Sequence, residues 1–127
     1  MEKFEALYDW VVDNCSYRAI ENIAADSVDW EPEAALDLFT RQSGNCFSYA
    51  AAVAMLGRNL GLDTRGVIGD CYQTYMWVYH GWTEVNYAGK LYVCDAEMEG
   101  VFAPNREWTW DLFMKEYGTT PTEYDEY

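Results

Sequence analysis

The chain has 127 residues, half of them apolar, which is enough for one domain with an ordinary hydrophobic core. Its net charge is −14, from 8 basic and 22 acidic residues, and no basic cluster interrupts the acidic excess. Nucleic acids and anionic membranes are therefore excluded as favoured partners, because phosphate binding depends on Lys and Arg. The longest apolar run, Tyr49 to Leu56, is too short to cross a bilayer.

The N-terminus does not resemble a signal peptide, because Glu2, Lys3 and Glu5 stand where an apolar core is needed. As written, the sequence predicts a cytoplasmic protein. If the chain was excised from a longer protein, an extracellular or cell-surface location is equally consistent with it. The four cysteines are widely spaced without a C-x-x-C pair, which argues against a zinc ribbon and against a dense disulfide scaffold.

The first half of the chain predicts three helices. Apolar residues at helical spacing predict one over Glu2–Cys15, and residues 16–29 show no sustained periodicity and predict a connection. Pro32 suits the start of a second helix that ends near Thr40. The break Ser43-Gly44-Asn45 then supplies a cap for a third helix reaching about Leu60, which is small or apolar nearly all round and is therefore expected to be buried.

Cys46 falls in the first turn of this central helix. The unpaired N–H groups and the dipole of a helix N-terminus favour a thiolate, the reactive form of cysteine. The alternative is that Cys46 is a small buried apolar residue, as free cysteines often are. The rest of the sequence decides between the two.

The second half changes to extended structure. A first strand is predicted over Thr64–Ile68, a loop over Tyr72–Tyr75, and a hairpin from strands Trp77–Tyr87 and Leu91–Cys94 around the turn Ala88-Gly89-Lys90.

The C-terminal region carries weaker signals. Residues 101–108 look irregular, and Thr109 is a suitable cap for a last short helix that ends near Tyr117. One domain over residues 1–118, followed by a loosely attached acidic tail at 119–127, is the predicted organisation.

The hairpin brings two polar residues together. His80 is the only histidine. If the hairpin closes on a two-residue turn at Ala88-Gly89, Asp95 lies opposite Trp82, one diagonal step from His80 on the same face, whereas a three-residue turn would put Asp95 on the other face. A cysteine nucleophile needs a histidine that takes and returns a proton, and a third group that orients the imidazole. Cys46, His80 and Asp95 are thus the candidate catalytic residues.

Four sequence blocks occur in order: GNCFSYA at 44–50, LGLDTRGVIG at 60–69, HGWTEV at 80–85 and LYVCD at 91–95. Together they resemble the core of the transglutaminase-like superfamily. The resemblance implies an α+β, papain-like fold, in which N-terminal helices and a central helix carrying the cysteine pack on a small antiparallel sheet. It also implies acyl transfer on amides, with Cys46 as nucleophile, His80 as acid and base, and Asp95 as the orienting group.

The resemblance leaves several features open. Gly81 stands where the family more commonly has alanine, which could loosen the strand. Gln42 is a candidate oxyanion donor but lies closer to the cysteine than the corresponding glutamine of papain-like proteases, so the backbone N–H of Cys46 is the safer donor. Trp77 and Trp82 are candidate substrate-binding residues.

Three readings of function follow. The first is an enzyme that forms a thioester with a peptide or protein substrate. The second is a catalytically idle module that binds a peptide or protein partner through Trp77, Tyr79 and Trp82. The third is a metal site of Cys46, His80 and Asp95, which lacks closely spaced ligand pairs.

No acidic loop has the spacing of a calcium site, so neither a metal nor a cofactor is expected. The substrate and the oligomeric state stay open.

Overall fold

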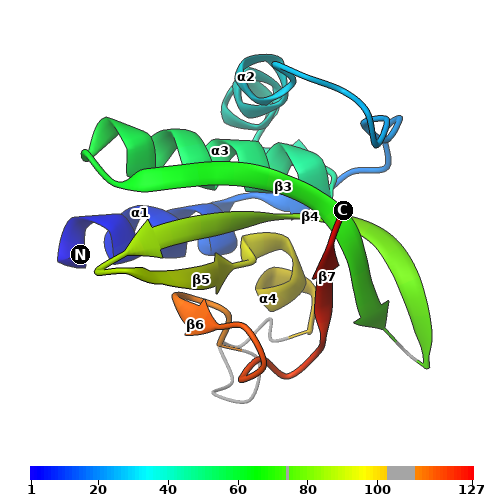
Figure 1. The fold of residues 1–127 in the computed structure, drawn as a ribbon. Coiled ribbons are helices and arrows are strands. Elements are labelled where there is room, and N and C mark those ends of the chain that lie inside the picture. The colour runs from blue at the N-terminus through cyan, green and yellow to red at the C-terminus, as the bar shows by residue number, and fades with distance from the viewer. Residues whose placement is uncertain (74, 103–110) are drawn as a thin grey trace.

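The computed structural model describes residues 1–73, 75–102 and 111–127. Helices and short strands alternate up to the third helix, and strands predominate after it (Figure 1). The elements are α1 (Glu2–Asn14), β1 (Ser16–Tyr17), α2 (Glu31–Arg41), β2 (Ser43–Gly44), α3 (Cys46–Asn59), β3 (Asp63–Gln73), β4 (Met76–Tyr87), β5 (Lys90–Cys94), α4 (Ala96–Phe102), β6 (Lys115–Glu116) and β7 (Tyr124–Glu126).

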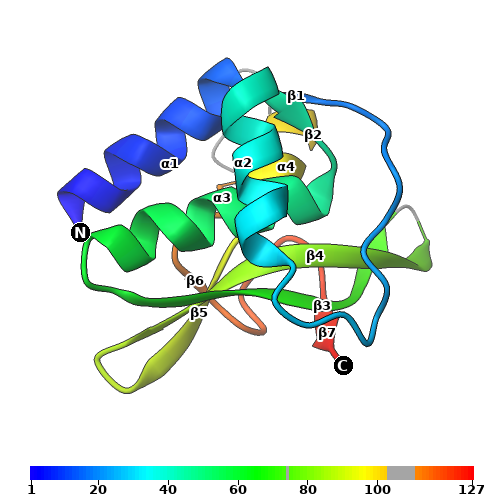
Figure 2. The same cartoon turned by 90° about the horizontal axis from the view of Figure 1, so that it is seen from above.

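Helix α3 lies at the centre, between the other N-terminal helices and the sheet. It packs against α1 and α2 on one side and against β3 and β4 on the other, as Figures 1 and 2 show. Its small buried residues let the strands approach closely: Thr64 donates a hydrogen bond to the carbonyl of Ala54 (2.5 Å), and Thr83 donates to that of Ala50 (2.7 Å). The predicted burial of this helix is confirmed, and the N-terminus of α3 is held rigidly over the sheet.

The sheet has five strands in the order β6-β5-β4-β3-β7, and all their pairings are antiparallel. Strands β4 and β5 are joined by two residues with positive φ, Ala88 (54°) and Gly89 (81°), which is the geometry of a type I′ turn. The register pairs Thr83 with Cys94, so the predicted two-residue turn and its parity are confirmed. A second, parallel pairing joins β1 to β2 just before the start of α3.

The N-terminal helices follow the sequence closely, and the α+β fold of the transglutaminase type is confirmed. All three predicted N-terminal helices are present, with ends shifted by one or two residues. The helix predicted over 2–15 is α1, the one predicted from 32 to about 40 is α2, and the one predicted from the break at 43–45 to about 60 is α3. The first predicted strand, Thr64–Ile68, is too short: β3 extends to Gln73 because it pairs with β4 along its whole length.

The C-terminal part differs most from the sequence-based expectation. Residues 111–117 contain the short strand β6 rather than the end of a helix, and the predicted cap Thr109 and most of the region 101–108 lie outside the described residues. Residues 119–127, expected to be a loose tail, contribute β7, which pairs with β3 beside Gly69, Asp70 and Cys71. This strand is secured by its pairing with β3 and by the packing of the partly buried Tyr124 against the core, both of which depend on residues far away in the sequence.

Within the described part of the chain, no helix combines the length and the hydropathy that a membrane span requires.

Candidate active site

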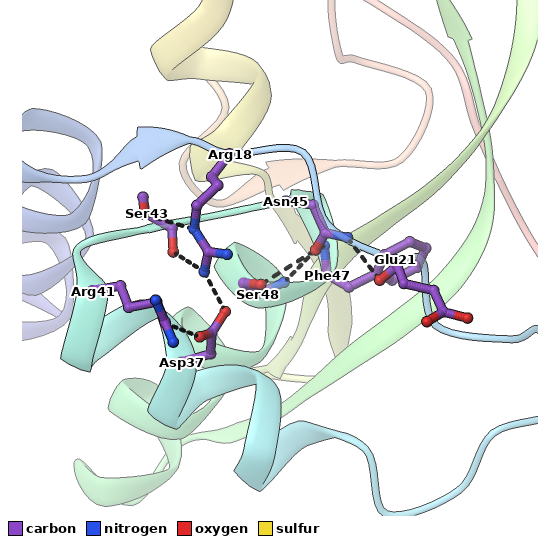
Figure 3. Close-up of polar contacts among 8 residues, drawn as sticks. All are labelled: Arg18, Glu21, Asp37, Arg41, Ser43, Asn45, Phe47 and Ser48. Carbon is purple, nitrogen blue, oxygen red and sulfur yellow. Dashed lines mark hydrogen bonds and ion pairs between the residues drawn. The ribbon is translucent and has the colours of Figure 1, made fainter.

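Cys46 is the first residue of α3 and is 8% exposed. Asn45 caps the helix: its Oδ1 accepts hydrogen bonds from the backbone N–H groups of Phe47 (3.1 Å) and Ser48 (3.2 Å) (Figure 3). Among the described residues, none accepts a hydrogen bond from the backbone N–H of Cys46. The Asn45 side chain thus pairs with the backbone N–H groups of Phe47 and Ser48. The backbone N–H of Cys46, beside the thiol, stays available for a ligand.

His80 and Asp95 meet as the parity of the hairpin predicts. His80 lies on β4, and Asp95 follows β5 and precedes α4. The distance from His80 Nε2 to Asp95 Oδ2 is 2.7 Å, and each residue is 2% exposed. A buried carboxylate at this distance fixes the tautomer and the orientation of an imidazole.

Cys46 lies on the opposite side of the imidazole. Because Nε2 contacts Asp95, the nitrogen left to face Cys46 is Nδ1, and a hydrogen bond to Cys46 contributes to the protonation of His80. Burial alone lowers the pKa of His80, but the charge of Asp95 and the hydrogen bonds to Asp95 and Cys46 outweigh it and raise this pKa well above 6.5. The arrangement favours an imidazolium beside the sulfur.

A cleft of about 350 Å³ opens over these residues. It combines side chains from β1, α3, β3, β4, α4 and the segment between β1 and α2. Its lining consists of Tyr17, Asn22, Cys46, Gln73, Val78, Tyr79, His80, Glu97 and Val101. The cleft gives a substrate access to Cys46 and His80, whereas Asp95 is not among its lining residues.

The family model of the transglutaminase-like superfamily matches residues 1–108. The chain belongs to this superfamily. No curated protein sequence matches it significantly.

Solved structures show the same transglutaminase-like fold. A candidate cysteine protease from Cytophaga hutchinsonii is 24% identical over 73% of this chain and 30% of its own, with a TM-score of 0.57. A transglutaminase is 22% identical over 73% and 25% of the two chains, with a TM-score of 0.50. An arylamine N-acetyltransferase from Bacillus cereus, which has a Cys-His-Glu catalytic triad, is 13% identical over 78% and 42%, with a TM-score of 0.58. The chain therefore spans less than half the length of each of these proteins.

In this transglutaminase-like chain, Asp95 is held by more than His80. Its Oδ2 also accepts a hydrogen bond from the hydroxyl of Tyr124 (2.7 Å), and its Oδ1 accepts one from the backbone N–H of Met98 (3.2 Å). Burial, followed by the charge of Asp95, raises the pKa of Tyr124 well above 10, so its hydroxyl remains a donor. Sequence reasoning missed Tyr124, because it lies in the segment that was expected to be a loose tail. Its aromatic side chain was the one local signal that favoured packing against the protein.

Of the four other residues singled out from the sequence, Tyr79 lines the cleft, whereas Gln42, Trp77 and Trp82 do not. Trp82 is fully buried: its ring lies 6.2 Å from that of His80 at 21°, and its Nε1 donates to the hydroxyl of Tyr117 (2.9 Å). Trp77 is 47% exposed and packs against Tyr72, and Gln42 is an exposed residue at the C-cap of α2. Trp82 thus backs the imidazole from inside the protein, where a substrate does not reach.

Glu97 is the acidic residue of the cleft that sequence reasoning missed. It lies in the first turn of α4, 8% exposed, and burial followed by the charge of Asp95 raises its pKa to about 7, although the charge of His80 lowers it. One ligand atom each from Cys46, His80 and Glu97 lies within 4.8 Å of the others. Of the described residues, these could converge on a metal ion, whereas the metal set considered from the sequence, without a metal being expected, included Asp95, which is bonded to the other ring nitrogen.

Proposed function

We propose that this chain is a transglutaminase-like cysteine enzyme that acts on amide bonds of peptides or proteins through a thioester at Cys46. The observation that carries the proposal is a helix-capped cysteine and an imidazole that share one cleft, with a buried carboxylate bonded to the imidazole behind it. The chain covers less than half the length of each of the solved structures that it resembles. Its activity and its substrate class are therefore proposals and are not taken over from those proteins.

The first half of the reaction forms the thioester. The Cys46 thiolate attacks the carbonyl carbon of the amide, a carbon–sulfur bond forms, and the π electrons of the carbonyl move to its oxygen. When the tetrahedral intermediate collapses, the carbon–nitrogen bond breaks and the His80 imidazolium gives its proton to the departing amine. Asp95, hydrogen-bonded to Nε2, keeps the imidazole in place and stabilises its positive charge.

The second half resolves the thioester. Neutral His80 takes a proton from water or from an incoming amine, which attacks the carbonyl carbon and expels the Cys46 thiolate. Water gives a carboxylic acid, and an amine gives a new amide. The acyl donor and the acceptor decide between hydrolysis, deamidation and transfer.

The test uses two reagents that react with Cys46 in different ways. Iodoacetamide alkylates a thiolate directly, and p-nitrophenyl acetate acylates it with release of p-nitrophenolate. We expect iodoacetamide to label Cys46 faster than Cys15, Cys71 and Cys94, as located by mass spectrometry, and p-nitrophenyl acetate to give a burst of one equivalent. H80A should slow both reactions. Labelling of Cys46 no faster than that of Cys15, or no acetyl group on Cys46, contradicts the proposal.

The second candidate is a catalytically idle module that binds a peptide or protein partner. Exposed apolar side chains at the tip of the β3–β4 hairpin favour it, namely Tyr72, Tyr75, Met76 and Trp77. Trp82 does not belong to this surface, because it is buried. Binding that survives C46A and is lost on W77A, combined with an unreactive Cys46, would identify such a module.

A further inference from the structure

The orientation of the Asn45 side chain is fixed by its partners. Its Oδ1 faces the backbone N–H groups of Phe47 and Ser48, which can only donate, so this atom is the carbonyl oxygen and the other end is the NH₂ group. That NH₂ group lies 3.3 Å from the side chain of Asn22 and 3.5 Å from the backbone carbonyl of Glu21 (Figure 3 shows the contact with Glu21). The capping residue therefore also orients the side chain of Asn22.

The same reasoning orients Asn22. Because Asn45 donates, the atom of Asn22 that receives the hydrogen bond is Oδ1, and the NH₂ group of Asn22 is directed away from Asn45. Among the described residues, no acceptor is bonded to this NH₂ group. Asn22 lines the cleft of Cys46 and His80, whereas its neighbours Glu21 and Ile23 line a separate cavity beside α2.

The segment that carries Asn22 is anchored on both sides. Before it, the Arg18 guanidinium donates to Ser43 Oγ (2.9 Å) and Asp37 (2.6 Å), as Figure 3 shows. The backbone N–H of Arg18 also donates to the carbonyl of Gly44. After it, the Tyr79 hydroxyl donates to the carbonyl of Ile23 (2.5 Å). Asn22 itself is exposed, so its amide stands at the open cleft on a fixed piece of backbone.

We propose that the side-chain amide of Asn22 and the backbone N–H of Cys46 form the oxyanion hole of this site. The inference rests on the proposed function, since it concerns the tetrahedral intermediate of that reaction. When the carbon–sulfur bond forms, the carbonyl oxygen takes the negative charge, and these two donors stabilise it until the carbon–nitrogen bond breaks. Asn45 serves both donors: it leaves the Cys46 N–H free and turns the NH₂ group of Asn22 away from itself. This assigns to Asn22 the role that the sequence suggested for Gln42, which lies outside the cleft.

The experiment compares acylation with alkylation in single variants. Acylation by p-nitrophenyl acetate passes through an oxyanion, whereas alkylation by iodoacetamide displaces iodide without one. We expect N22A to slow acylation of Cys46 by about 10²-fold and to leave alkylation within about twofold, because loss of one oxyanion donor costs about 10²–10³ in rate. N22D should be at least as slow, since a carboxylate cannot donate and repels the oxyanion. E21A, the matched control on the same segment, should acylate like the wild type.

Each other outcome contradicts a defined part of the argument. Acylation of N22A at the wild-type rate removes Asn22 from the oxyanion hole. An equal loss of acylation and alkylation in N22A, or an equal loss of acylation in E21A, also overturns the inference, because the effect then belongs to the thiolate or to the segment rather than to the amide. A wild-type protein that is alkylated at Cys46 but not acylated refutes the proposed function itself.

Discussion

Replacement of Glu97 by Gln should change how the stability of the protein depends on pH. Glu97 is buried beside Cys46 and His80, and burial followed by the charge of Asp95 raises its pKa from 4.5 to about 7. The folded protein therefore binds this proton more tightly than the unfolded chain does. The resulting stabilisation is complete below pH 4.5 and is lost as the pH rises through 7.

The magnitude follows from the shift. A difference of about 2.5 units at about 1.36 kcal/mol per unit corresponds to a free energy of about 3 kcal/mol. Glutamine keeps the shape of the side chain and does not titrate. We therefore expect the wild type to lose about 3 kcal/mol of unfolding free energy relative to E97Q between pH 4 and pH 8.

Urea unfolding of the wild type and E97Q at both pH values measures this difference, and the titrating groups that do not interact with Glu97 cancel in the comparison. E5Q, a change on the exposed side of α1, is the control and should leave the difference between pH 4 and pH 8 nearly unchanged. If the wild type and E97Q keep the same stability difference at both pH values, within about 0.5 kcal/mol, the burial argument for Glu97 is wrong.

Three further substitutions test the support of the site. D95N should slow acylation by p-nitrophenyl acetate by about 10³–10⁴-fold, because an amide no longer fixes the tautomer of His80 or stabilises its charge; a loss below tenfold would contradict this role. G81A should lower the unfolding free energy in urea by about 1–3 kcal/mol, because the added Cβ would lie 2.5 Å from the ring of buried Phe47; unchanged stability would show that the ring has room to move. Y124F should cost about 1 kcal/mol and slow acylation a few-fold through the lost hydrogen bond to Asp95, and a fully active, equally stable variant would remove Tyr124 from the support of the carboxylate.

The result expected for G81A differs from what the sequence suggested. Against the family pattern, glycine at this position suggested a loosened strand. In the fold, the ring of Phe47, the residue after Cys46, packs directly on the backbone of Gly81. The glycine thus allows the start of α3 to approach β4, and with it brings Cys46 close to His80.

The sequence by itself determined the position of Cys46 and the meeting of His80 with Asp95. Both depend on interactions that span few residues: a helix cap places Cys46 at the first turn of α3, and a two-residue turn fixes the parity of the β4–β5 hairpin. Local interactions of this kind are encoded in adjacent residues, so they are readable without the fold. The ordered blocks from 44 to 95 then pointed to the superfamily that the chain belongs to.

Only the tertiary structure decided what surrounds these three residues. Asn22 comes from a segment without periodicity, Tyr124 from the end of the chain, and Glu97 from a helix that the sequence did not predict. Likewise, Trp77 and Trp82 both lie on the strand predicted over Trp77–Tyr87, yet Trp77 is half exposed and Trp82 is fully buried. The physical reason is that burial and contacts between distant segments arise from packing of the whole chain, whereas capping and strand alternation require only neighbours.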